Sequence, residues 1–144
     1  MKQIKSTMQF KGYSVLEATY VSKERQTVST PESRIELSPS FSQRVIKLAD
    51  HQYSLELGII IGDINQSNDL PFYINVRIKG FFELSEEEKA YDLMRVNATA
   101  IMYPYLRSTV TSLTALGNIN PIILPTINLV QMFQDSQAEK KEND

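Results

Sequence analysis

The sequence predicts an α+β fold in which antiparallel strands come first and helices follow. Over much of the first half of the chain, side chains alternate between apolar and polar, which is the period of a strand with one buried face. After residue 85, apolar residues instead recur every three or four positions, which is the period of an amphipathic helix. Strands followed by helices are typical of α+β proteins.

Two segments carry the clearest strand pattern. Residues 53–61 place apolar side chains on every odd position, and residues 72–79 place them on every even position. The intervening residues 62–69 are rich in turn formers. We therefore expect an antiparallel hairpin with a long loop, and a bulge or bend at Gly80.

Two earlier strands are predicted from a weaker pattern. Residues 13–22 are rich in β-formers, and residues 33–48 contain two apolar stretches separated by Ser-Pro-Ser at 38–40. Residues 22–33 are mostly polar and are expected to form a loop.

A long helix is predicted to follow the strands. Ser85 and Glu88 have the spacing of a capping box, and Gly117 is suited to end the helix. Pro104 lies inside this span, so either the helix kinks there or a second helix begins near it. The apolar residues expected on one face of the helix are Met102, Leu106, Val110, Leu113 and Leu116.

The segment 118–127 is unusually apolar for a segment that contains two prolines. The prolines exclude a regular helix, so we expect a loop that either packs on the core or covers another apolar surface. A short helix is predicted at 128–137. The tail 137–144 is charged and is expected to be disordered, which leaves a single domain over residues 1–136.

Composition excludes several classes of function. The chain has 144 residues, a net charge of −2 and no cysteine. The charge offers no surplus of basic groups for nucleic acid, and the absence of cysteine excludes disulfides and cysteine zinc sites. The N-terminus lacks the apolar stretch of a signal peptide, and no apolar run is long enough to span a membrane. A cytoplasmic protein without membrane insertion is expected.

No set of residues predicts catalysis, a metal site or a cofactor. His51 is the only histidine, and it follows Asp50 in a turn-like stretch, where a structural or solvated role is expected. Glycines form no phosphate-binding loop, and the acids Glu86 to Glu88 lack the spacing of cation ligands. The chain is therefore not expected to be an enzyme.

The stretch from Tyr103 to Phe133 resembles the C-terminal signature of the SecB chaperone family. That signature combines an aromatic-Pro-Tyr-x-Arg motif, a helix ending in glycine, an apolar proline-containing loop and an asparagine between apolar residues. Here the elements fall at Tyr103-Pro104-Tyr105-x-Arg107, Gly117, Pro121 to Pro125 and Ile127-Asn128-Leu129. Weaker resemblance extends over most of the remaining chain.

The resemblance implies a four-stranded antiparallel sheet with a crossover, backed by a long helix, a proline-containing loop and a short second helix. It implies a homotetramer, built as a dimer of dimers, that uses no cofactor and no nucleotide. It also implies that non-native polypeptides bind in hydrophobic grooves on the sheet. The groove residues expected from the loop and second helix are Ile119, Ile122, Ile123, Leu124, Ile127, Leu129, Met132 and Phe133.

The sequence departs from export-type SecB where those proteins dock the SecA motor through acidic residues. Glu17 fits one of these positions, whereas Val21 and Asn75 stand where further acids are expected. The groove tryptophan is absent, and Leu129 replaces an aromatic residue. SecA binding is therefore expected to be weak, and an antitoxin client, as served by some SecB-like proteins, is an equal alternative to export.

Two other functions remain open at the level of sequence. The first is a structural or assembly protein that has the same fold but filled grooves. The second is an enzyme acting on a small ligand, which would need a polar pocket with convergent titratable groups.

Overall fold

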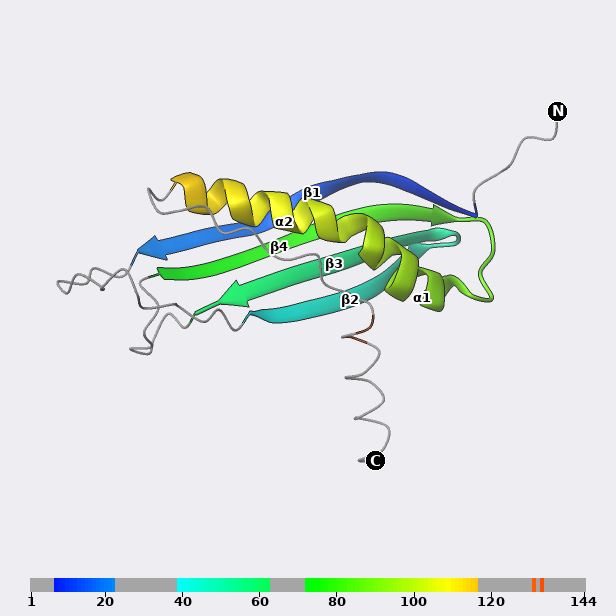
Figure 1. Cartoon of the computed structure of the whole chain (residues 1–144). Coiled ribbons are helices and arrows are strands. Elements are labelled where there is room, and N and C mark those ends of the chain that lie inside the picture. Colours follow the sequence, from blue (N-terminus) through cyan, green and yellow to red (C-terminus); the bar gives the residue numbers. More distant parts are fainter. Residues whose placement is uncertain (1–6, 23–38, 63–71, 117–130, 132, 134–144) are drawn as a thin grey trace, which may run out of the picture.

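A computed structural model describes residues 7–22, 39–62 and 72–116, together with residues 131 and 133. A four-stranded antiparallel sheet carries a helical segment across one of its faces, which confirms the predicted α+β fold (Figure 1). The strands are β1 (Met8–Ser22), β2 (Ser40–Ala49), β3 (Gln52–Ile61) and β4 (Phe72–Leu84). The helical elements are α1 (Ala90–Leu93), the π-helical turn η1 (Met94–Ala98) and α2 (Thr99–Leu116).

The strand order is β1-β4-β3-β2, so the first of the described strands crosses over to pair with the fourth. The hairpin predicted from the alternating pattern is confirmed, because β3 and β4 pair in antiparallel register from Gln52 opposite Glu83 to Ile61 opposite Ile74. β2 and β3 form a second hairpin, whose turn has Asp50 and His51 between the paired residues Ala49 and Gln52.

The irregularity expected at Gly80 occurs, but the extra residue lies in β1. Phe10 pairs with Phe82 while Tyr13 pairs with Gly80, so two residues of β1 stand opposite one of β4. A second shift follows between Val15 and Glu17. Such bulges increase the local twist of a strand, and here they occur in an edge strand.

Gly80 has a packing role instead. A Cβ atom added at this residue would overlap the Sδ atom of Met102, which lies on α2 and is fully buried. Glycine therefore allows the helix to approach the middle of β4 closely.

The core lies between the sheet and the helical segment. On the sheet side, all the odd positions of 53–61 and all the even positions of 72–78 are buried, as the alternation predicts. On the helix side, Met102, Leu106 and Val110 are buried, also as predicted. Leu116 departs from the prediction because it is 85% exposed, and the buried row continues at Thr114, four residues after Val110.

The helical segment begins later than expected, and the predicted capping box is wrong. Helix α1 starts after Lys89, and no side chain caps it. The backbone amide of Ser85 donates to the carbonyl of Thr7 (3.0 Å), and the Glu87 carboxylate accepts from the backbone amide of His51 (2.8 Å). Contacts with Thr7, just before β1, and with His51, in the β2–β3 turn, thus hold the residues that the local sequence assigned to a helix cap.

Pro104 neither breaks the helix nor starts a new one, since α2 runs without interruption from Thr99 to Leu116. The irregularity lies in the wide turn η1, which ends at Ala98, six residues before Pro104. This excludes a new helix starting at Pro104, which was one of the two alternatives that the sequence left open.

His51 has the structural role that the sequence predicted, and it joins the β2–β3 turn to the end of β4. Its backbone is left-handed, with φ of 63°. Its carbonyl accepts from the Leu84 amide (2.8 Å), and its Nδ1 lies 2.7 Å from the Leu84 carbonyl. Since a carbonyl only accepts hydrogen bonds, Nδ1 carries the proton in this arrangement.

Replacing Glu87 with glutamine should reduce thermal stability at neutral pH and have little effect in acid. The hydrogen bond from the His51 amide, and secondly the Lys47 ammonium 3.4 Å away, hold the pKa of Glu87 below its usual range. A lowered pKa stabilises the fold above the unfolded-state value of about 4.3, and this contribution is lost as the pH falls through the folded-state pKa. Thermal melts of wild type and variant from pH 3 to pH 7 check this expectation.

The neighbouring substitution Glu86→Gln is the matched control, and it should lower the melting temperature at neutral pH less than Glu87→Gln does. If Glu87→Gln lowered the melting temperature by the same amount at every pH, the ionised Glu87 carboxylate would not be the stabilising group.

Candidate functional site

One of the eight predicted groove residues lies within the described part of the chain. Phe133 is helical, which agrees with a second helix at this point, and its half-buried ring packs against the core. The other seven residues lie outside the described residues, so their role stays a prediction: Ile119, Ile122, Ile123, Leu124, Ile127, Leu129 and Met132.

The structure adds a stripe on β2 that the sequence reasoning missed. Phe41, Gln43 and Val45 alternate with outward-facing residues and lie on the helix-bearing face, in register with buried residues of β3. All three are only half-buried. We call them the β2 stripe. Their alternation was a sequence signal, but the proline at 39 and the polar glutamine obscured it.

The buried side of the β2 stripe is formed by α2 and the turn η1. The ring of Phe41 meets Tyr103 edge-on, with centroids 6.3 Å apart. Tyr103 is buried, and this burial raises the pKa of its phenol, while the Arg107 guanidinium over its ring opposes part of the increase. The stripe therefore continues into the core on one side and keeps an accessible apolar surface on the other.

Gln43 is fixed in the middle of the β2 stripe. Its Nε2 donates to the backbone carbonyl of Arg95 (2.9 Å) and to the hydroxyl of Thr99 (2.5 Å). Arg95 lies in η1, where the wide helical turn directs this carbonyl to the strand. Thr99 is fully buried, so this contact holds the carboxamide from inside.

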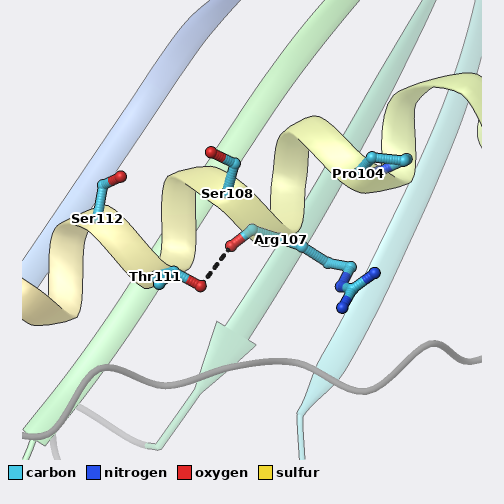
Figure 2. A pocket seen from close by; sticks show the side chains of 5 residues that line it. All are labelled: Pro104, Arg107, Ser108, Thr111 and Ser112. Atoms are coloured by element: carbon cyan, nitrogen blue, oxygen red, sulfur yellow. Dashed lines mark hydrogen bonds between the residues drawn. The ribbon is translucent and has the colours of Figure 1, made fainter.

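A shallow hollow of about 310 Å³ lies along α2 and is lined by Pro104, Arg107, Ser108, Thr111 and Ser112 (Figure 2). The Thr111 hydroxyl donates to the carbonyl of Arg107 (3.0 Å), which is a local helix contact. Arg107 is the one ionisable residue in this lining, so the hollow lacks the convergent acid and base groups that catalysis uses.

The opposite face of the sheet contains the positions singled out for SecA. Glu17, Thr19 and Val21 lie on this outer face of β1, and Asn75 stands opposite Thr19 on β4. The Glu17 carboxylate lies 3.6 Å from the Arg77 guanidinium and accepts from the Thr19 hydroxyl (3.2 Å). The predicted site residue Glu17 is thus half-buried on the expected face, and its charge is already paired.

The outer face carries more positive than negative charge around Glu17. The register places Arg44, Glu56 and Lys79 side by side across β2, β3 and β4 on this face. With the Glu17–Arg77 pair, the centre of the face has three cations and two carboxylates, namely Arg44, Arg77 and Lys79 against Glu17 and Glu56.

A row of half-exposed apolar side chains follows the border between β1 and α2. The rings of Tyr13 and Tyr105 lie 4.6 Å apart, and Tyr105 also stacks on Phe10 with centroids 5.6 Å apart. Val15 and Ile101 extend this row, and both are exposed. We call Tyr13, Val15, Ile101 and Tyr105 the β1–α2 rim.

Metal and membrane sites find no support in the described residues. They include no group of three or more histidine, cysteine, aspartate or glutamate side chains placed to hold a metal ion. None of the helices in the described ranges combines the length and apolarity needed to cross a bilayer.

Comparisons with known proteins agree with this fold. A family model described as preprotein translocase subunit SecB matches residues 8–140. The chain is 29% identical over 143 residues to the uncharacterized protein MJ0357 of Methanocaldococcus jannaschii, an alignment that covers 96% of this chain and 90% of that protein. It is 28% identical over 101 residues to the protein-export protein SecB of Saccharophagus degradans, covering 68% of this chain and 60% of that protein.

Among solved structures, the chain resembles the Mycobacterium tuberculosis Rv1957 SecB-like chaperone in complex with a ChAD peptide from the Rv1956 HigA1 antitoxin. The TM-score is 0.68 at 14% sequence identity, over 84% of this chain and 91% of that one. At this identity the likeness establishes the fold.

Proposed function

Because the chain belongs to the SecB family, we propose that it is a chaperone that binds non-native polypeptides in a hydrophobic groove without using ATP. The β2 stripe is the observation that carries this proposal. Its two apolar side chains, Phe41 and Val45, pack against the core yet remain half-exposed. Burial of apolar surface contributes about 25 cal/mol per Å² and is non-directional, so such a groove accepts many client sequences.

The groove extends from the β2 stripe to the loop and second helix. We assign its other wall to Ile119, Ile122, Ile123, Leu124, Ile127, Leu129, Met132 and Phe133, and Phe133 already contacts the core. The proposed chaperone needs no cofactor or metal and catalyses no reaction. It works in the cytoplasm. Its single domain covers residues 1–136, and a charged tail follows at 137–144.

The experiment that tests this function is suppression of aggregation of a reduced, unfolded test protein, followed by titration of the complex. Capture without added nucleotide supports the chaperone. A hydrophobic-dye titration of the native oligomer distinguishes a chaperone from an assembly protein with filled grooves, because the assembly protein would bind neither the dye nor the client. If the oligomer bound neither of them, the proposal would be overturned.

We expect the protein to assemble as a homotetramer, and the β1–α2 rim supports a self-association surface. Sedimentation at micromolar concentration should give a mass near that of four 16.4 kDa chains. Ile101→Asp, which puts a charge in the rim, should reduce this mass. Leu48→Asp, at another exposed apolar residue near the end of β2, is the control and should leave the mass unchanged. A wild-type monomer at this concentration would contradict the assembly.

The client is either an exported protein or a dedicated partner such as an antitoxin. Export is supported by relatives that are protein-export proteins, and the antitoxin role is supported by the fold shared with the mycobacterial SecB-like chaperone. The charge of the outer face favours the second role, because SecA docking in export-type members uses acids.

Binding to the basic, zinc-containing C-terminal peptide of SecA should be weak or absent. Glu17 is paired with Arg77, and among the described residues the centre of the outer face has one more cation than carboxylates, which opposes binding of a basic peptide. Calorimetry of the oligomer against this peptide at low salt checks the expectation. Submicromolar affinity that is lost in Glu17→Ala would show that the protein is an export chaperone.

A further inference from the structure

The β2 stripe is an apolar surface with one polar group at a fixed place. Phe41, Gln43 and Val45 are successive residues on the same face of one strand, so Phe41 and Val45 lie about 13 Å apart with the carboxamide between them. An extended polypeptide repeats its side chains with the same spacing, whereas a helix does not. The stripe therefore matches a client segment in extended conformation.

Internal hydrogen bonds fix the orientation of the Gln43 carboxamide, so they also determine which of its atoms can bind a client. An amide nitrogen has two N–H groups, and the two acceptors on Arg95 and Thr99 use both. The oxygen Oε1 is the remaining group, and no residue within the described ranges donates to it. Gln43 keeps part of its surface accessible, and rotation of the amide would break both internal hydrogen bonds.

Resting on the proposed function, we infer that Gln43 makes the groove select extended client segments that place a hydrogen-bond donor between two apolar side chains. Apolar side chains two residues to either side of the donor contact Phe41 and Val45, and the donor binds Oε1. A client with an apolar residue at the central position covers Oε1 without providing a donor, which leaves an acceptor desolvated and unpaired. The groove therefore favours extended segments in which one hydrogen-bond donor interrupts a row of apolar side chains on the same face.

Two fluorescent peptides test this selectivity on the wild-type oligomer. They share apolar residues two positions to either side of a central residue, which is threonine in one peptide and valine, its near isostere, in the other. The threonine peptide should bind about three- to tenfold more tightly, the range expected for one hydrogen bond. A groove without donor selectivity gives the opposite order, because valine is the more apolar residue.

Gln43→Met removes the acceptor while keeping the length of the side chain, and it should bring the ratio of the two affinities to one or below. Ser42→Ala, on the other face of the same strand, is the control and should keep the wild-type ratio. The wild-type measurement decides the question even if the Gln43 variant does not fold.

The outcomes separate the inference from the function on which it rests. Equal affinities of both peptides, or tighter binding of the valine peptide, would overturn the selectivity and leave the chaperone function intact. Absence of binding of either peptide, together with no capture of an unfolded protein, would overturn both.

Discussion

Replacing Phe82 with alanine should lower the free energy of unfolding by about 3–5 kcal/mol, the range for removing a buried aromatic ring from a core. Phe82 is 2% exposed and is among the largest buried side chains. Its ring lies 5.2 Å from Phe10 on the neighbouring strand, so the truncation also removes an aromatic contact between β1 and β4. Urea denaturation at one fixed protein concentration measures the loss without changing the assembly equilibrium.

Phe81→Ala is the matched control. It is the adjacent residue, with the same side chain, but it points to the outer face of the sheet and is half-buried. The expected loss is clearly smaller, because less apolar area returns to water on unfolding. If both variants lost the same free energy of unfolding, the core would not lie on the helix-bearing face of the sheet.

Placing a carboxylate in the groove should have the largest effect on client binding. We expect Ile123→Asp to weaken the affinity for a reduced, unfolded protein by about tenfold or more. A carboxylate in an apolar groove must either be desolvated or hold water there, and either costs several kcal/mol. Titration of a labelled client into each oligomer measures the change.

Ile60→Asp is the control for this experiment. Ile60 is an exposed isoleucine of β3 on the outer face, so the same change in charge occurs away from the groove. It should bind the client as wild type does. Wild-type affinity in Ile123→Asp would place the groove elsewhere, and loss of folding in that variant would show that Ile123 belongs to the core.

The parts of the fold that the sequence predicted well are those specified by local periodicity. The buried face of β3 followed from its odd-numbered residues, and that of β4 from its even-numbered residues, because each strand packs on the core with one face only. The helical row through Met102, Leu106 and Val110 followed for the same reason. The strand order required the family resemblance, since alternation says nothing about which strand is a neighbour.

The parts that the sequence did not predict depend on contacts between distant residues. Glu87 lies in a run of three acids that suits a helix start, but the amide of His51, 36 residues earlier, binds its carboxylate. Gln43 looked like an ordinary polar residue, and its importance comes from Arg95 and Thr99, 52 and 56 residues later. The hydrogen bonds of Gln43 could therefore be identified only from the three-dimensional structure.

The crossover has a consequence for the order in which this chain acquires its structure. The tight β2–β3 turn and the β3–β4 hairpin join neighbours in sequence, so they form with a small loss of chain entropy. β1 pairs with β4 alone among the described strands, so it stays unpaired until residues 72–84 have left the ribosome. Non-local pairing of this kind slows folding and exposes strand edges to aggregation. The first of these strands to be synthesised must therefore wait for the fourth before it can pair.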